Sequence, residues 1–351
     1  MRPSAVAAVL ETEFLTPGAH TPVMLWGPPG VGKSQLVAAI AARHGAGVVD
    51  IRLAQMEPTD LRGIPFRRDD GVVWSAPALL PRAERDPPRG ILFLDELSSA
   101  PPTVTAAAYQ LILDRRLGEY RVPDAWVIFA AGNRQGDRGV TYQMPAPLAN
   151  RFTHYEVEPD LDDWVAWAEA QGIDPRIIAF LRFRPDLLFD FDPAHYRAAF
   201  PSPRSWEFAH RALEKFASRR DLLREALAAC VGAPVAAEFY TFCEHLRQLP
   251  DIAAIARGES VPVPVGIDLQ YGLAAALVHH TVRLRGAERE RAAAHVLRFA
   301  HHLRPRELGV MLVMDLQRGF GRPLIDLPDF AAWAAAVGDL VTPVERRGGA
   351  T

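Results

Sequence analysis

The chain has 351 residues, of which 49% are hydrophobic and 23% are charged, and its formal net charge is −3 at pH 7. This length allows two or three domains with their own cores, and the composition excludes an intrinsically disordered chain. The slightly acidic balance does not favour nucleic acid or an anionic membrane as a partner.

Signals for export, membrane insertion and disulfide bonding are weak. The first 15 residues hold only a short apolar stretch followed by acids, which does not resemble a signal peptide. An uncharged run at residues 271–282 is short for a membrane span and contains two histidines. Cys230 and Cys243 lack CxxC spacing, so we expect thiols in a reducing cytoplasm, with a disulfide as the alternative.

The first predicted strand, residues 23–26, leads into the loop GPPGVGKS and then into a helical pattern. This loop fits the spacing G-x-x-x-x-G-K-[ST], in which backbone N–H groups surround phosphates, the lysine bridges the β- and γ-phosphates and the hydroxyl binds Mg²⁺. Lys33 and Lys215 are the only lysines among 39 basic residues. The residues expected to contact the nucleotide are Gly27, Pro28, Pro29, Gly30, Val31, Gly32, Lys33 and Ser34.

The next strand is expected at residues 48–53, and the segment at about residues 60–80 then carries a hairpin signal. Asp70-Gly71 lies between IPFRRD and VVWS, which predicts a two-residue turn. This hairpin is either a binding surface or a cover for the sheet, and the sequence leaves both open. We expect Phe66, Val72 and Trp74 near the stem of the hairpin. We expect Arg67 and Arg68 near its tip.

A third strand, residues 91–94, ends in an acidic pair. Asp95 is suited to bind Mg²⁺ together with Ser34, and Glu96 is suited to polarise an attacking water. The alternative is an aspartate that caps the next helix. The position of the pair, about 60 residues after a phosphate-binding loop, favours the metal and water roles.

Further strands are expected at residues 126–131 and 153–157, and helical patterns separate several of the strands. This alternation predicts an α/β fold with a parallel, doubly wound sheet. After about residue 160 the pattern becomes helical, with a helix start at SPRS and a Pro-rich linker at residues 258–268. The expected domains are an α/β core at residues 1–158, a helical lid at 159–250 and a helical extension at 251–351.

The order of these motifs resembles that of AAA+ ATPases over about residues 20–215. The segments that carry the resemblance are the phosphate loop, the strand ending in Asp-Glu, VIFAAGN, PAPLANRF and SPRS. It implies that Asn133 is sensor 1, that Arg151 is the arginine finger for a neighbour's ATP, and that Arg204 is sensor 2 on the lid. Taken singly, Asn133 also fits a turn cap and Arg151 an ordinary surface arginine.

Within AAA+ the insert RLAQMEPTDLRGIPFRRDDGVVWSAPALLP looks most like that of the MoxR type, including CbbQ and NorQ. This resemblance implies ATP and Mg²⁺ as cofactors, a hexameric ring, and a hairpin that projects toward the pore or the client surface. It further implies a cytoplasmic ATPase that remodels or activates a client protein, with a von Willebrand factor A-domain partner.

One segment also resembles the McrB-type restriction GTPases. In AAGNRQGDRGVTYQMPAPLANRF, the Asn…Asp-Arg order leaves the choice between ATP and GTP open, and with it the roles of Arg134, Asp137 and Arg138. A nucleic-acid motor therefore remains an alternative function, although the acidic balance and the lack of a recognisable DNA-binding module count against it. A nucleotide-dependent binding switch with little turnover is another alternative.

Overall fold

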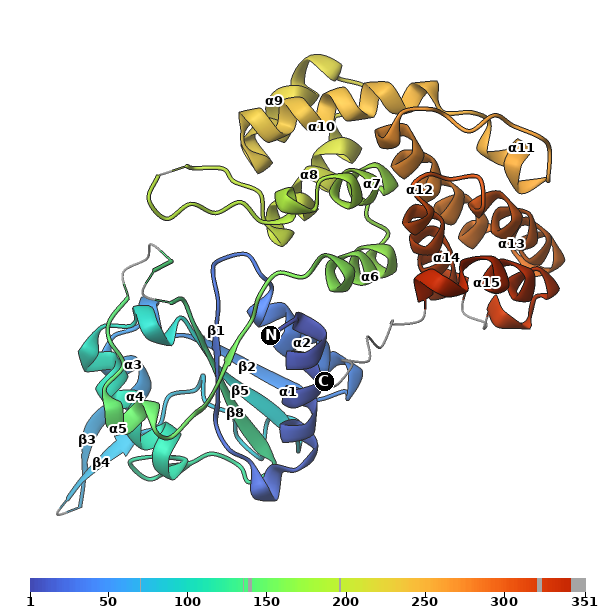
Figure 1. Cartoon of the computed structure of the whole chain (residues 1–351). Helices are drawn as coiled ribbons and strands as arrows, with labels where there is room; N and C mark the ends of the chain where they lie inside the picture. Colours follow the sequence, from blue (N-terminus) through green and yellow to red (C-terminus); the bar gives the residue numbers. More distant parts are fainter. Residues whose placement is uncertain (70, 135, 138–140, 196, 321–323, 342–351) are drawn as a thin grey trace, which may run out of the picture. The chain divides into compact units, whose positions relative to one another are not determined.

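The computed structural model describes residues 1–69, 71–134, 136–137, 141–195, 197–320 and 324–341 (Figure 1). They form two compact units. Unit 1 contains Met1–Asp160 and Asp192–Tyr196, and unit 2 contains Leu161–Phe191 and Arg197–Thr351.

Unit 1 is an α/β domain built on one parallel sheet. The strand order is β2-β5-β8-β1-β9, so β1 is internal and β9 is an edge strand. The elements are α1 (Pro3–Leu15), β1 (Val23–Trp26), α2 (Lys33–Arg43), β2 (Gly47–Arg52), α3 (Pro58–Arg62), β3 (Ile64–Arg68), β4 (Gly71–Ser75), β5 (Gly90–Asp95), α4 (Pro102–Asp114), β6 (Arg116–Leu117), β7 (Tyr120–Arg121), β8 (Trp126–Gly132), α5 (Ala146–Ala149) and β9 (Thr153–Glu156).

Helices cover both faces of this sheet, which explains the nearly continuous apolar character of its inner strands. In Figure 1, α1 and α2 lie on one side of the sheet, and α3 and α4 lie on the other. All seven residues of β8 are buried. The core on the α3–α4 side is formed by alternate strand residues such as Leu92 and Leu94, packed with Leu111 of α4.

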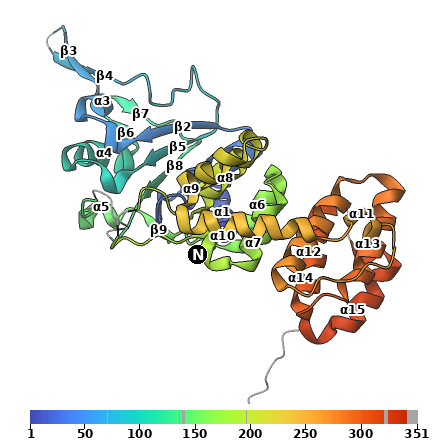
Figure 2. The same cartoon turned by 90° about the horizontal axis from the view of Figure 1, so that it is seen from above.

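Unit 2 is all helical in the part of the chain that the structure describes. Its α-helices are α6 (Leu161–Gln171), α7 (Pro175–Phe183), α8 (Pro203–Lys215), α9 (Arg220–Val231), α10 (Ala233–His245), α11 (Ile252–Ala256), α12 (Ile267–Arg283), α13 (Gly286–Ala300), α14 (Arg306–Phe320) and α15 (Pro328–Val341). Figure 2 separates the helices α11–α15 from α6–α10, and each group has its own core. An α/β core with a parallel sheet followed by a helical region is therefore confirmed.

Local signals in unit 2 act as the sequence indicates. Helix α8 begins at the SPRS signal because the Ser202 hydroxyl accepts from the Ser205 N–H while the Ser205 hydroxyl accepts from the Ser202 N–H. Trp206 on its apolar face is fully buried.

Cys230 and Cys243 are free thiols. Among the helices described, none has both the length and the apolar character needed to cross a membrane.

Candidate functional site

The phosphate-binding loop joins β1 to α2, and its glycines are required by its shape. Gly30 and Gly32 have φ angles of 87° and 96°, which side chains other than glycine rarely adopt. A Cβ at Gly27 would lie 2.6 Å from the Val157 carbonyl oxygen. Because α2 begins at Lys33, directly after Gly32, the loop delivers the chain to a helix N-terminus that attracts anions.

Lys33 is held in the loop by oxygen atoms. Its side chain is only 9% exposed, and its Nζ donates to the Gly27 carbonyl at 2.6 Å and to the Pro28 carbonyl at 3.1 Å. It also donates to Asn133 Oδ1 at 3.1 Å. The ammonium thus connects the loop to the end of β8, across 100 residues of sequence.

The two oxygen groups expected to bind Mg²⁺ lie next to each other. Ser34 Oγ donates to Asp95 Oδ2 at 2.8 Å, and Asp95 Oδ1 accepts from the Glu96 N–H at 2.8 Å. Glu96 has φ 58° and ψ 29°, a left-handed conformation that costs about 1 kcal/mol or more for a residue with a side chain. Such strain is common where a fold must aim a functional side chain, here directly beyond Asp95.

Asn133 is fixed by Ser98, which lies two positions after the acidic pair. Its N–H donates to Ser98 Oγ at 3.0 Å, and a Cβ at Gly132 would lie 2.6 Å from the same oxygen. Glycine at 132 therefore allows β8 to approach Ser98 closely. Sequence reasoning missed Ser98, because nothing in LSSAPP distinguishes a supporting hydroxyl from a helix cap.

The parallel sheet explains why these residues meet. The strands β1, β8 and β5 are neighbours and run in the same direction, so their carboxyl ends lie at one edge. The residues that this edge brings together are those of the loop from Gly27 to Ser34, with Asp95, Glu96 and Asn133.

A further carboxylate, Asp50 on β2, belongs to the same edge and was not predicted. Partial burial raises the pKa of Asp50, and the negative charges of Asp95 and Glu96 raise it further. Its position after two valines, VVDIR, resembles any polar residue on an edge strand, so the sequence offered no signal.

The arginines singled out in the sequence have different surroundings. Arg151 follows α5, close to the edge strand β9; it is exposed and forms no ion pair or side-chain hydrogen bond with any residue that the structure describes. Arg204, near the start of α8, is exposed and belongs to unit 2. Arg134 instead pairs with the buried Asp137, with Nη2–Oδ1 and Nε–Oδ2 distances of 3.2 Å. Arg138 lies outside the described residues.

The Arg134–Asp137 pair shapes the loop after β8. Asp137 Oδ2 also accepts from the Arg134 N–H at 2.9 Å, and the Asp137 N–H donates to the Arg134 carbonyl at 3.0 Å. The side-chain hydrogen bonds from its guanidinium to Asp137 are the main reason that the pKa of Arg134 is raised. A structural role in closing this turn thus accounts for both residues without reference to the nucleotide base.

The insert forms the antiparallel hairpin β3–β4, but its turn differs by one residue from the expected one. Gly71 pairs with Arg68 inside the ladder, so Gly71 belongs to β4 and is not a turn residue as the Asp70-Gly71 signal predicts; Asp70 lies outside the described residues. Asp69 has φ 51°, which a tight hairpin turn requires and aspartate tolerates. Val72 consequently pairs with Arg67 near the tip instead of lying near the stem.

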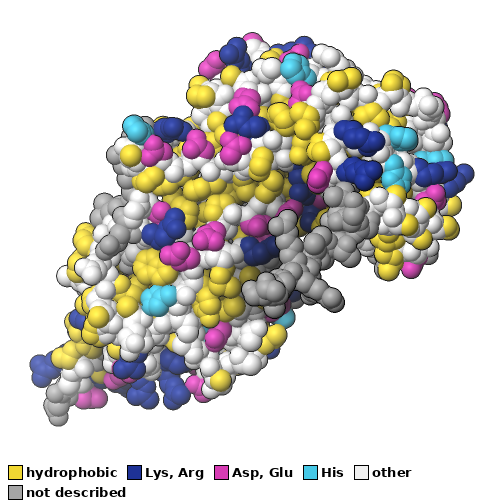
Figure 3. All heavy atoms as spheres, in the orientation of Figure 1, with side chains coloured by type: hydrophobic (Ala, Val, Ile, Leu, Met, Phe, Trp, Pro, Cys, Tyr) yellow, Lys and Arg dark blue, Asp and Glu magenta, His cyan; other side chains and the backbone are white. Residues whose placement is uncertain are grey.

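Both faces of this hairpin expose apolar side chains. The exposed fractions are 69% for Ile64, 46% for Phe66, 66% for Val72 and 40% for Trp74. In Figure 3, basic and hydrophobic side chains gather at the lower left, where Figure 1 places the hairpin. A two-stranded ribbon with so much apolar surface has the composition of an interaction site.

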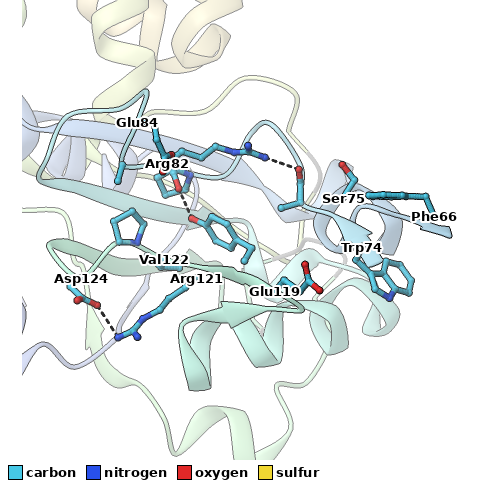
Figure 4. Close-up of a pocket in the computed structure, with 14 residues that line it drawn as sticks. Phe66, Trp74, Ser75, Arg82, Glu84, Glu119, Arg121, Val122 and Asp124 are labelled. Atoms are coloured by element: carbon cyan, nitrogen blue, oxygen red, sulfur yellow. Dashed lines mark hydrogen bonds and ion pairs between the residues drawn. The ribbon is translucent and has the colours of Figure 1, made fainter. Parts of the chain in front are cut away.

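A groove of about 670 Å³ lies between this hairpin and the short hairpin β6–β7 (Figure 4). Phe66 and Trp74 line it from one side, and Tyr120 and Arg121 line it from the other. The Tyr120 hydroxyl donates to the Pro81 carbonyl at 2.6 Å, which fixes the ring in the wall. Burial raises the pKa of Tyr120.

The oxygen atoms of Ser34 and Asp95 at this edge of the sheet are suited to bind the Mg²⁺ of a nucleoside triphosphate. A hydroxyl and a carboxylate oxygen lie within 2.8 Å of each other, and oxygen ligands of this kind are those that Mg²⁺ prefers. When bound, the metal would supply charge neutralisation for the phosphates. Among the described residues no cluster of three or more His, Cys, Asp or Glu side chains is arranged to hold a metal ion.

A protein-family model matches the part of the chain that contains this site. Residues 22–152 match the family model described as "AAA domain (dynein-related subfamily)". Midasin from Giardia intestinalis is 32% identical over 145 residues, which cover 39% of this chain and 3% of midasin. The chain thus spans a small fraction of that relative's length.

Similar solved structures are more distant in sequence. NtrX from Brucella abortus in complex with ADP is 17% identical, with a TM-score of 0.39, over 96% of this chain and 69% of that one. A RuvB mutant from Thermotoga maritima is 17% identical, with a TM-score of 0.34, over 81% of this chain and 88% of that one. Residues 22–152 are thus similar to AAA domains of the dynein-related subfamily, and this range contains the loop from Gly27 to Ser34 together with Asp95, Glu96 and Asn133.

Proposed function

We propose that this chain is a Mg²⁺-dependent ATPase of the MoxR type that assembles into a hexameric ring and remodels or activates a client protein. The observation that carries the proposal is the convergence of three strand ends on one site. Lys33 contacts Asn133 at 3.1 Å, and Ser34 contacts Asp95 at 2.8 Å. Phosphate binding, metal binding and water activation would thus occur within one cluster.

The roles of the individual residues follow from their chemistry. Lys33 would bind the β- and γ-phosphates, and Ser34 with Asp95 would hold Mg²⁺. Glu96 would accept a proton from the attacking water, and Asn133 would orient that water. The neighbouring subunit's Arg151 would offset charge that develops on the γ-phosphate, and Arg204 would contribute a second cation from the lid.

Two variants separate nucleotide binding from hydrolysis. Lys33→Ala should abolish ATPase by weakening ATP binding, whereas Glu96→Gln should bind ATP and hardly turn it over, because only water activation is lost. Titration of a fluorescent ATP analogue measures both affinities. The matched control is Lys215→Ala, which removes the chain's only other lysine from the exposed end of α8.

The expected order of affinities makes this test decisive. If Glu96→Gln binds the analogue no better than Lys33→Ala, the assignment of roles is wrong. Loss of binding in Lys215→Ala would instead mean that a general destabilisation had been measured.

Arg151 is proposed to act in trans, since it is exposed near a sheet edge and has no partner among the described residues. Arg151→Ala chains lack a finger but keep Lys33, and Lys33→Ala chains lack nucleotide binding but keep the finger. Each variant alone should be at least about a thousandfold slower than wild type. A mixture that exchanges subunits should recover part of the ATPase, and the recovery should vary with the mixing ratio.

The β3–β4 hairpin is proposed as the surface that contacts the client. Its exposed apolar residues and the groove beside it support this proposal, and the resemblance to MoxR proteins adds a von Willebrand factor A domain as the expected partner. Pull-down with ATP-loaded Glu96→Gln rings would identify the client. Recovery of salt-sensitive nucleic acid instead of protein, together with a preference for GTP, would favour the McrB-like motor.

A further inference from the structure

A hydrogen-bonded link joins the end of β1 to the turn that carries Arg151. Trp26 is the last residue of β1 and directly precedes Gly27 of the phosphate-binding loop. Its indole Nε1 donates to His154 Nδ1 at 2.8 Å, and His154 Nε2 lies 2.8 Å from the Ala149 carbonyl oxygen. The Trp26 and His154 rings also stack, with centroids 6.0 Å apart and an angle of 14° between the planes.

The partners determine which nitrogen of His154 carries the proton. An indole N–H can only donate, so His154 Nδ1 must accept. A carbonyl oxygen can only accept, so Nε2 must carry the hydrogen and donate to Ala149. A neutral histidine with its hydrogen on Nε2 satisfies both neighbours at once, and a ring without this pair of nitrogens would break both bonds.

One end of this link lies next to the phosphate-binding loop, and the other end lies in the turn that carries Arg151. The Ala149 carbonyl also accepts from the Phe152 N–H at 3.1 Å, and the Arg151 N–H donates to the Leu148 carbonyl at 3.0 Å, so these bonds form the turn that presents Arg151. At the other end, the Trp26 carbonyl accepts from the Val157 N–H at 2.7 Å. Trp26, which directly precedes the loop, is thus bonded to β9 through its indole to His154 and to Val157 through its carbonyl.

We propose that His154 is a positioning residue that couples the nucleotide-binding loop of a chain to the arginine which that chain presents to its neighbour. The proposal rests on the trans role of Arg151 given above. In this proposal His154 contacts no reacting atom. It acts through its hydrogen bonds to the Ala149 carbonyl and to Trp26. An oligomeric ring would in this way transmit the nucleotide state of one subunit to the nucleotide site of the neighbouring subunit.

The complementation mixture tests whether His154 positions the finger, because a finger-positioning residue matters in only one of the two chains. His154→Phe keeps an aromatic ring and loses both hydrogen bonds. Placed in the Lys33→Ala chain, which donates the finger, it should lower the recovered ATPase by about tenfold, since a small misplacement of a catalytic group has effects of this order. Placed in the Arg151→Ala chain, which accepts the finger, it should change the recovery less than about twofold.

Matched variants control for general damage to the fold. His154→Gln retains one acceptor and one donor and should restore much of the loss. Trp26→Phe removes one of the two bonds and should act in the same direction as His154→Phe. His44→Phe, which changes a histidine at the end of α2 in the same unit, should leave the mixture unaffected.

Hydrogen exchange supplies a readout that does not require hydrolysis. In chains that carry Glu96→Gln and Arg151→Ala, ATP binding should alter amide exchange at residues 146–152 although no finger reaches a neighbour's nucleotide. His154→Phe should remove this ATP-dependent change without altering the affinity for ATP, and His154→Gln should preserve it.

The outcomes separate this inference from the proposed function. If the mixture of Lys33→Ala and Arg151→Ala chains recovers no ATPase despite proven exchange, the trans role of Arg151 is wrong and the coupling falls with it. If that mixture recovers but His154→Phe has no effect in the donor, or the same effect in both chains, the coupling is overturned and the trans role stands.

Discussion

Replacement of Glu169 by glutamine should stabilise unit 2 at neutral and alkaline pH and have little effect in mild acid. Glu169 lies on α6 at a cavity of about 690 Å³ whose walls include α7, α12 and α14. Burial, followed by the negative charge of Asp315, raises its pKa from 4.5 to about 7, while Arg318 and Arg182 oppose the rise. The folded state therefore favours the protonated carboxyl over the carboxylate.

The sign and size of the effect follow from this pKa. A raised pKa means that the stability contributed by the neutral carboxyl is present below pH 4.5 and is lost as the pH rises to about 7. The difference of about 2.5 pH units corresponds to about 3.4 kcal/mol at 1.36 kcal/mol per unit. Because Glu169 is partly exposed and solvent screens its charge, we expect about 1–2 kcal/mol.

The assay must read unit 2 separately, because a chain with two units need not unfold in one step. Pulsed amide hydrogen exchange along a urea titration gives the free energy of unfolding of α6 and α14 near pH 5 and near pH 8. Glu169→Gln should exceed wild type near pH 8 and equal it near pH 5, and the exposed Glu225→Gln on α9 should differ at neither. A gain that is the same at both pH values, or a loss near pH 8, would refute the reasoning.

Two further predictions concern the β3–β4 hairpin. Replacing Arg67 and Arg68 by serine should weaken client capture in the pull-down while basal ATPase stays within about twofold, since neither lies at the nucleotide site; a collapse of ATPase would show that the hairpin belongs to the core. Gly63→Ala should disrupt β3–β4 pairing, measured as faster amide exchange, because φ is 81° and a Cβ would lie 1.7 Å from the Ser75 carbonyl oxygen. Gly71→Ala is its control, as the nearest atom there is 3.9 Å away, and equal exchange in the two variants would contradict the steric argument.

Local sequence determined the parts of the site that lie within a few residues of one another. The loop from Gly27 to Ser34 was predictable because its left-handed glycines and the helix start at Lys33 are requirements of adjacent residues. The acidic pair after β5 was predictable for the same reason, since an apolar strand ending in Asp95 and Glu96 is a local pattern. The alternation of these strands with helices also sufficed for the fold class.

Other features depended on how distant segments pair, and no local pattern encodes that pairing. The strand order places β8 between β1 and β5, which brings Asn133 to 3.1 Å from Lys33. The sequence suggested Asn133 only through the resemblance to AAA+ ATPases. The hairpin turn was misplaced by one residue because Asp-Gly is a strong turn signal, while the ladder that pairs Arg68 with Gly71 decides the register.

The link through His154 shows most clearly what local sequence patterns do not predict. In FTHYEVE the histidine looks like any polar residue on an edge strand, and Trp26 looks like the last apolar residue of β1. Only the parallel pairing of β1 with β9 sets Met24 opposite His154 and so brings His154 beside Trp26, 128 residues away in the chain. Local sequence determines backbone conformation through steric limits on each residue, whereas the meeting of two distant side chains is decided by the packing of the whole domain.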